Sequence, residues 1–454
     1  MSQGGCLIGL DIGSSEVKGV LLAASGRLLA GVSRHNRLLA PRDGWVELDP
    51  AGHLENVCGI LRELAAAAPE KVMAVAMAAA SGNTLLTTEA GEPLGNIISW
   101  MDRRASERIP AALSGLEAED VRRIAGWPCV GSFPLAHLAW LRENRPDSLR
   151  RAGHVGMDTD WLAYQLTGIW RMDHSTATTF HLQDQVTGGY YQPFLDRLGI
   201  ERQRLSELIA PGQAVGTLRP EMAVRTGLPE TTLLAAGCFD HPAAARAAGV
   251  IEPGMLMLSC GTSWVGFVPC GKRETVLKAR MLCDPFLSGS GGPWGGMFSV
   301  PHIGRAITWY VDNVIAPREA PERRVRVFDE MAGRSRPGAN GVKIDLRQKP
   351  QAPDADPADV SRAVMESAAR LIADKLAEAS SAGLSYRRAV MVGGPSRSPV
   401  WPAIVADITG LEVEVGGRGA GARGAAMLAG IGAGFYGDEQ DALAVWGRGR
   451  GFDG

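Results

Sequence analysis

The sequence lacks the clustered positive charge that nucleic acids and anionic membranes require. Its 47 lysines and arginines are balanced by 49 aspartates and glutamates, for a formal net charge of −2, and they form no basic block or stripe. No stretch reaches the 18 or so uncharged apolar residues of a spanning helix, and the N-terminus has no signal-peptide pattern. We therefore expect neither a nucleic acid nor a membrane as a partner.

Paired cysteines and short repeats are also missing. The seven cysteines are dispersed, with no C-x-x-C pair, which argues against a disulfide framework or a zinc site and favours a reducing compartment. The expected location is therefore the cytoplasm. The 57 glycines follow no period, which excludes collagen-like and repeat folds. They gather instead near expected strand ends, where the backbone turns tightly or approaches a ligand.

What is present indicates a soluble α/β protein of at least two domains, since 454 residues exceed what one core usually serves. Each half opens with an apolar hairpin, at residues 6–24 and 255–268, and buried strands followed by helices come after it. We predict two similar domains, residues 1–249 and 250–454, facing each other across a cleft. Residues 316–357, rich in Arg, Pro and Asp, are expected to be a surface excursion with little regular structure.

Hydrophobic patterns predict the elements that fill these domains. The expected strands are 72–77, 233–237 and 389–392, and the expected helices are 51–68, 134–144, 158–167, 241–248, 358–382 and 421–434.

The first hairpin turn carries residues suited to phosphate and to a metal ion. Gly13 lets backbone N–H groups approach phosphate oxygens, and Ser14 and Ser15 add hydroxyl donors. Asp11 can hold Mg²⁺ directly or through water, and Lys18 adds positive charge nearby. A single turn of this composition more often has only a structural role. The interpretation as a phosphate site therefore depends on support from the rest of the chain.

Support comes from the second half. Its hairpin turn, with Gly261 and Thr262, offers the same hydroxyl and glycine chemistry. Gly393 and Gly394 then end a strand and open a helix, with Ser398 close behind, where backbone can contact a nucleotide and a helix N-terminus favours an anion. At each position the alternative is a tight turn with only a structural role. Two hairpins of this kind, one opening each half of the chain, are much less expected by chance than a single one.

Two further positions suggest an acceptor site. Asp240 ends a buried strand before an alanine-rich helix, where a carboxylate can act as a general base toward a hydroxyl; a helix N-cap is the alternative. Trp100 and Asp102 could form a sugar platform, because an aromatic face suits the C–H side of a sugar and carboxylate–guanidinium pairs order its hydroxyls. A half-buried surface tryptophan beside a salt bridge is the alternative there.

In combination these stretches resemble the FGGY carbohydrate kinases of the actin-like ATPase superfamily. They occur in the family's order and cover nearly the whole chain. The resembling stretches are residues 9–18, 44–50, 100–105, 138–144, 160–168, 237–240, 259–263, 392–398, 406–407 and 424–426.

The resemblance implies two ribonuclease-H-like domains that close around a catalytic cleft and use ATP with Mg²⁺. It makes Asp240 the catalytic base, and it implies Asp11 and Asp240 as the metal carboxylates. The residues expected around ATP are Asp11, Gly13, Ser14, Ser15, Lys18, Gly261, Thr262, Gly393, Gly394 and Ser398. Those expected around the acceptor are Asn83, Thr84, Trp100, Asp102, Phe133 and Asp240.

The expected reaction is phosphorylation of a terminal hydroxyl of a small sugar, with D-xylulose the first candidate among ketopentoses. Another sugar or polyol, such as glycerol, a tetrulose, ribulose, gluconate or a deoxysugar, is the alternative, because Leu85 replaces a polar sugar contact of the family. Two other classes stay open: an actin-like ATPase that uses nucleotide for conformational switching, and a sugar-binding regulator without catalysis. A homodimer is possible.

Overall fold

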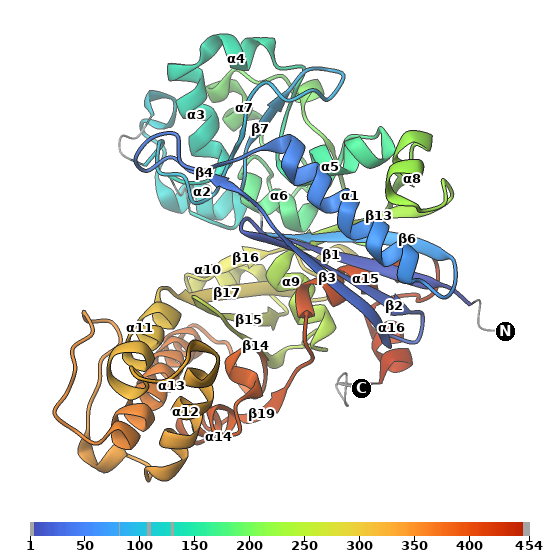
Figure 1. The fold of residues 1–454 in the computed structure, drawn as a ribbon. Helices are drawn as coiled ribbons and strands as arrows, with labels where there is room; N and C mark the ends of the chain where they lie inside the picture. Colours follow the sequence, from blue (N-terminus) through green and yellow to red (C-terminus); the bar gives the residue numbers. More distant parts are fainter. Residues whose placement is uncertain (1–3, 81, 107–109, 129–130, 448–454) are drawn as a thin grey trace.

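The computed structural model describes residues 4–80, 82–106, 110–128 and 131–447 (Figure 1). Two six-stranded sheets organise them, in the orders β12-β13-β6-β1-β2-β3 and β16-β17-β15-β14-β18-β19. The strands of the first sheet are β1 (Cys6–Ile12), β2 (Glu16–Ala23), β3 (Leu28–His35), β6 (Val72–Ala79), β12 (Ala214–Thr217) and β13 (Leu233–Phe239). Those of the second are β14 (Gly254–Cys260), β15 (Trp264–Cys270), β16 (Leu282–Asp284), β17 (Trp294–Val300), β18 (Tyr386–Gly393) and β19 (Glu412–Val415). We call the part built on the first sheet the first lobe, and the part built on the second sheet the second lobe.

Both sheets begin in the same way, which confirms the predicted α/β fold of two similar halves. In the first, β1 pairs antiparallel with β2 and parallel with β6. In the second, β14 pairs antiparallel with β15 and parallel with β18. The central strands β1, β6 and β14 are apolar over nearly their whole length because helices or neighbouring segments cover both of their faces.

The first lobe carries an extra group of helices and short strands above its sheet (Figure 1). Leu138, Val155, Phe180 and Leu195 belong to the separate hydrophobic core of this group. Its helices are α2 (Ala118–Ala125), α3 (Pro134–Asn144), α4 (Pro146–Arg151), α5 (Asp158–Thr167), α6 (His174–Phe180) and α7 (Gln192–Leu198). Its short strands are β4 (Leu38–Leu39), β5 (Glu47–Leu48), β7 (Leu85–Thr87), β8 (Ile97–Ile98), β9 (His154–Gly156), β10 (Arg171–Asp173) and β11 (Glu207–Ile209).

The last two helices return to the first lobe. Helix α15 (Ala420–Gly432) lies against β1 and against α9 (Asp240–Ala247), in the middle of the molecule (Figure 1). Glycines permit this approach, since a Cβ on Gly9 would lie 1.8 Å from the carbonyl oxygen of Ala422, and one on Gly424 would lie 1.9 Å from that of Ala243. The lobes are therefore joined by packing as well as by the chain, and the boundary between residues 249 and 250 stays a prediction.

Four more helices cover the sheets. They are α1 (Pro50–Ala67) and α8 (Pro220–Thr226) in the first lobe, and α13 (Pro357–Ser381) and α14 (Trp401–Thr409) in the second. Helix α1 begins where the Asp49 carboxylate accepts hydrogen bonds from the backbone N–H groups of Ala51 and Gly52, at 3.3 and 3.0 Å. No helix in the described ranges has the length and apolarity that crossing a membrane would need.

The segment 316–357 corrects one prediction. Its first half forms helix α12 (Pro321–Arg334), which packs on α13 through the buried side chains of Val327, Phe328 and Ala332. These apolar residues recur at helical spacing, but the surrounding arginines hid them in the composition. Residues 316–320, 335–338 and 342–356 have no helix or strand, as expected.

Candidate active site

A cleft of about 400 Å³ lies between the two lobes, and both contribute to its walls. The first lobe provides the ends of β1 and β13 and the start of α9. The second lobe provides the ends of β14 and β18 and the loop before α15. The lining residues are Asp11, Lys18, Asp240, His241, Ala244, Ser259, Val392, Gly393, Gly394, Ser396, Arg397 and residues 415–421.

Asp11 and Lys18 face each other across the first hairpin, where they are direct partners in the β1–β2 register. Burial and, after it, the nearby negative charge of Asp240 raise the pKa of the Asp11 carboxyl to about 7, while Lys18 opposes the rise. The Lys18 ammonium lies 3.1 Å from a Glu16 carboxylate oxygen and is half exposed. A buried carboxyl and a partly exposed cation thus meet at one end of the cleft.

Asp240 enters the cleft where β13 ends and α9 begins. One carboxylate oxygen accepts a hydrogen bond of 2.6 Å from the backbone N–H of His241, so the side chain is held at the helix start. Burial raises the pKa of Asp240, and the nearby His241 opposes the rise. A carboxylate whose pKa moves toward neutrality is a better proton acceptor at physiological pH.

Glycines form the opposite wall. Gly393 has a φ of +95°, and a Cβ there would lie 2.4 Å from the carbonyl oxygen of Cys260, so only glycine fits between β18 and β14. Gly419 precedes α15 with a φ of +63°, and a Cβ on Gly421 would lie 2.8 Å from an Asp11 carboxylate oxygen. The N-terminus of α15 therefore opens into the cleft beside Asp11, where its N–H groups favour an anion.

Several of these lining residues were not among the predicted site residues. Ser396 and Arg397 come directly after the predicted glycine pair, and the loop 416–421 brings four glycines and Arg418. The signal for the loop was the glycine cluster at 416–424. The loop was not predicted as part of the site because it lies some 400 residues from Asp11 in the sequence. Only the packing of α15 on β1 brings the two together.

The two hairpin tips lie beside this lining and not within it. Gly13 closes the first turn through its N–H, which donates to the carbonyl oxygen of Glu16 at 3.1 Å. Ser15 is exposed, as are Gly261 and Thr262 at the second tip, so their polar groups are open to a phosphate chain. Ser14 is buried, and its hydroxyl accepts a 2.9 Å hydrogen bond from the indole N–H of Trp100.

Ser398 corrects a prediction, since it does not line the cleft. Its hydroxyl donates to an Asp329 carboxylate oxygen at 2.7 Å and accepts from the backbone N–H groups of Val400 and Trp401. It thereby fastens the start of α14 to α12. The hydroxyl that does reach the cleft in this segment belongs to Ser396.

The predicted acceptor residues divide into two groups. Trp100 is 39% exposed, and the ring of Phe133 lies close by, since a Cβ on the intervening Gly82 would contact both side chains. Asn83 is buried, and its carbonyl oxygen accepts from the backbone N–H of Trp100 at 3.0 Å. We call Trp100 and Phe133, with Asn83 behind them, the aromatic wall. The hydrogen bond from Trp100 to Ser14 connects this wall to the first hairpin.

Asp102 and Thr84 correct the prediction of direct sugar contacts. Both Asp102 oxygens bind the guanidinium of Arg104, at 2.9 and 2.8 Å, and one also accepts from the Val46 N–H at 2.6 Å. The carboxylate is fully buried, as is the Thr84 hydroxyl, which pairs with His137 at 2.9 Å. These side chains hold the loops behind the wall because their polar atoms are already engaged inside the protein.

An unpredicted aromatic cluster stands between the wall and Asp240. Trp127 makes edge contacts with Phe133 and Phe239, and His181 stacks on Phe133 with ring centroids 5.4 Å apart. His181 is fully buried with a φ of +62°, and neither ring nitrogen has a hydrogen-bond partner. Burial lowers the pKa of its imidazole to about 3, which keeps the ring neutral.

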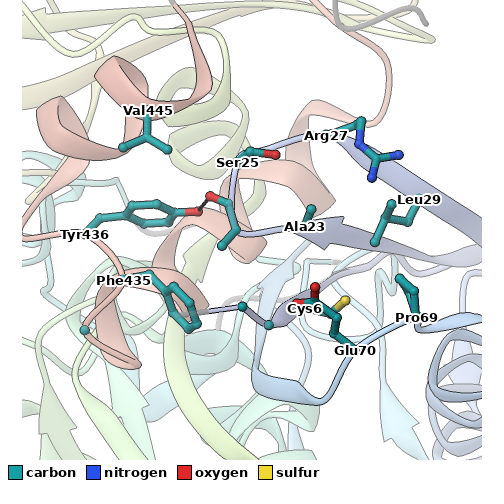
Figure 2. Close-up of a pocket in the computed structure, with 14 residues that line it drawn as sticks. Cys6, Ala23, Ser25, Arg27, Leu29, Pro69, Glu70, Phe435, Tyr436 and Val445 are labelled. Atoms are coloured by element: carbon teal, nitrogen blue, oxygen red, sulfur yellow. Dashed lines mark hydrogen bonds between the residues drawn. The ribbon is translucent and has the colours of Figure 1, made fainter. Parts of the chain in front are cut away.

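A second, larger pocket of about 630 Å³ lies at the other end of β1 (Figure 2). Cys6, Arg27, Glu70 and Phe435 line it, and the Tyr436 hydroxyl beside them donates to the carbonyl oxygen of Ala24. It holds one acidic side chain and no glycine-rich loop, so it lacks the paired carboxyls of the cleft. Its place at the chain ends separates it from Asp11 by the length of the strand.

Family models match both halves of the chain. Residues 6–246 match the N-terminal domain of the FGGY family of carbohydrate kinases, and residues 256–433 match its C-terminal domain. The chain belongs to this family. It is a sugar kinase of the FGGY type, and ATP is the phosphate donor of that family.

Curated relatives and solved structures agree with this assignment. The chain is 27% identical to an autoinducer-2 kinase of Yersinia enterocolitica and to one of Escherichia coli K12, covering 95–96% of this chain and 86–88% of those proteins. Its fold matches xylulose kinase from Rhodospirillum rubrum (TM-score 0.86, 24% identity) over 97% of this chain and 92% of that one. Gluconate kinase from Lactobacillus acidophilus matches with a TM-score of 0.86 at 19% identity, over 98% and 92%.

The cleft residues fit a nucleotide and its metal ion. Two carboxyls, Asp11 and Asp240, face the same space, and repulsion between them is what a bound cation would relieve. Among the described residues no three His, Cys, Asp or Glu side chains gather as a metal site. Phosphate oxygens and water would therefore complete the coordination of a Mg²⁺ ion, as is usual for this ion with nucleotides.

Proposed function

We propose that this sugar kinase transfers the γ-phosphoryl group of ATP to a terminal hydroxyl of a small acceptor held at the aromatic wall. The observation that carries the proposal is the meeting of Asp11, Lys18 and Asp240 with the glycine loops of the second lobe in one cleft. Phosphoryl transfer needs little more than positioning, charge neutralisation and a proton acceptor.

Each residue has a part in the proposed reaction. Gly393, Gly394 and the start of α15 bind the nucleotide through backbone groups, and Lys18 neutralises phosphate charge. Asp240 accepts the proton of the attacking hydroxyl and orients its oxygen toward phosphorus. Mg²⁺ bound with ATP would lie at Asp11 and Asp240 and would supply further charge neutralisation.

Asp240→Asn tests the proposed base. We expect kcat to fall by about 10²–10⁴-fold, since a general base contributes that much, while the fold and ATP affinity persist. Steady-state assays with nucleotide-binding measurements check this, and Asp374→Asn on the exposed face of α13 is the matched control. Near-normal turnover of Asp240→Asn would remove the assignment.

The acceptor is proposed to be small and to present an apolar face. The exposed part of the wall consists of Trp100 and Phe133, while Asn83, Thr84 and Asp102 are buried and bonded within the protein. An aromatic wall of this kind suits the C–H face of a small sugar. We name two acceptors: D-xylulose, expected from the sequence, and autoinducer-2, the acceptor in the names of the curated relatives.

A panel assay distinguishes these acceptors. ADP release is measured with D-xylulose, autoinducer-2, ribulose, gluconate, glycerol and a tetrulose, and we expect kcat/KM for one of the first two to exceed the rest at least tenfold. Preference for gluconate or glycerol would contradict the proposed apolar wall. ATP hydrolysis indifferent to every acceptor would instead favour a conformational ATPase, and tight acceptor binding without ADP release would favour a regulator.

A further inference from the structure

A buried chain of hydrogen bonds runs behind Asp240 and crosses from one lobe to the other. It starts at Asp284, the last residue of β16 in the second lobe, whose side chain is fully buried. One of its oxygens accepts from the Ser175 hydroxyl of α6, in the first lobe, at 2.7 Å. The same hydroxyl oxygen accepts from the backbone N–H of Phe239 at 3.2 Å. Phe239 is the residue directly before Asp240.

The other oxygen of Asp284 extends the contact to helix α9. It accepts from the backbone N–H of Phe286 at 2.7 Å, and the Phe286 carbonyl oxygen accepts from the Arg246 guanidinium at 3.0 Å. Arg246 lies in α9, six residues after Asp240, and also donates to Glu439 of α16 (Glu439–Trp446) at 2.8 Å. The helix that carries Asp240 is therefore held at its start and near its end.

Strand β16 is itself fastened to the first lobe. The Cys283 carbonyl oxygen accepts from the indole N–H of Trp127 at 3.0 Å and from the Gln185 amide at 2.9 Å. The Cys283 N–H donates to the carbonyl oxygen of Gly126 at 3.1 Å. Strand β16 thus has direct hydrogen bonds to the first lobe.

We propose that Ser175 and Asp284 are positioning residues for Asp240, and that the second lobe sets the geometry of the proposed base through them. The proposal rests on the proposed role of Asp240. The carboxylate stands at the junction of β13 and α9, so any rotation of the Phe239 peptide moves its oxygens. A displacement of about 1 Å at a reacting group can cost about 10²-fold in rate.

Burial makes this chain of hydrogen bonds rigid. Ser175 and Asp284 are both 0% exposed, so no water competes for these bonds, and breaking one leaves a buried polar group without a partner. Neither side chain lines the cleft, so neither touches ATP or the acceptor. Their effect on catalysis must therefore pass through the backbone at Phe239 or through helix α9, which Asp284 reaches by way of Phe286 and Arg246.

Ser175→Ala is the first test. It removes the hydroxyl that links Asp284 to Phe239, and we expect kcat to fall about tenfold while KM for ATP stays within twofold. The matched control is Ser361→Ala, which deletes an equally buried hydroxyl that bonds only the Pro357 carbonyl oxygen in α13. If folded Ser175→Ala keeps the kcat of the control, the proposal is overturned.

A double variant separates positioning from a general structural effect. When Asp240→Asn has removed the base, adding Ser175→Ala should change the residual rate by less than twofold, because there is no base left to position. Losses that multiply would overturn the proposal. Asp284→Asn, which keeps the shape but cannot accept both bonds, serves in place of Ser175→Ala if that variant fails to fold, with the same tenfold expectation.

The outcomes distinguish this proposal from the one on which it rests. Near-normal turnover of Asp240→Asn refutes the base assignment and this proposal with it. A large loss in Asp240→Asn with no loss in Ser175→Ala or Asp284→Asn refutes the positioning role alone.

Discussion

The Asp11 carboxyl titrates in an environment that other parts of the molecule create. Burial and the charge of Asp240 raise its pKa to about 7, although Asp11 lies in β1 and Asp240 begins α9. The same pair would attract a divalent cation together with phosphate. Burial disfavours the charged form of Asp11 relative to an exposed carboxyl.

This pKa predicts a pH-dependent effect of Asp11→Asn. A carboxyl whose pKa is raised in the folded state contributes its full share to the stability of the fold below about pH 4, where it is neutral. That contribution is lost as the pH rises through about 7. The variant should therefore gain stability relative to the parent at pH 8, on the order of 1–2 kcal/mol after allowing for solvent screening, and gain little at pH 4.5. Denaturant unfolding of the nucleotide-free protein measures it, with Asp374→Asn as control. An equal gain at both pH values would contradict the stated cause.

At the scale of elements, the contact between β1 and α15 brings the glycine-rich loop to Asp11. A Cβ on Gly9 would lie 1.8 Å from the Ala422 carbonyl oxygen and 2.5 Å from the Ala426 nitrogen, both rigid backbone atoms. The contact therefore depends on a glycine in the strand. It also explains why a C-terminal helix packs on the first sheet.

Gly9→Ala should force α15 away from β1. We expect a loss of stability of about 1–3 kcal/mol or more, with a higher KM for ATP, because the loop 416–421 shifts with the helix. Gly31→Ala in β3 is the control, since its Cβ would meet nothing closer than the Gly19 carbonyl oxygen of β2, at 3.8 Å. Thermal unfolding and ATP kinetics provide the comparison, and equal Tm values for the two variants would rule out this packing argument.

For the whole molecule, Arg273 joins the lobes at the edge opposite the glycine loops. Its guanidinium donates to the Gln185 side chain at 3.2 Å and to the carbonyl oxygens of Arg123 and Ile124 at 2.8 and 3.3 Å. The side chain is buried, so its loss removes hydrogen-bond donors from three acceptors of the first lobe.

Arg273→Ala should weaken the coupling between the lobes more than either lobe alone. Calorimetry is expected to resolve a broadened or divided unfolding transition, with a Tm several degrees lower for the first event. Arg326→Ala is the control, because that arginine is exposed and pairs only with Glu330 one helical turn away. A single sharp transition in both variants would show that the lobes are coupled elsewhere.

The sequence alone determined the fold class and the order of the elements. Hairpins, buried strands and helices are encoded by local periodicity, and Gly13, Gly393 and Asp240 stand at strand ends that this periodicity identifies. These features depend on neighbours a few residues away, so they were predictable without the tertiary structure.

Only the tertiary structure decided which polar groups remain free for a ligand. Asp102 and Ser398 belong to motifs that resemble the family's, yet Arg104 and Asp329 already bind their side chains. The loop 416–421 and the link from Asp284 to Phe239 join segments far apart in sequence. Such contacts depend on how helices pack on sheets, and no local sequence pattern specifies them. Packing decides which polar groups are buried next to each other, and therefore which of them form hydrogen bonds.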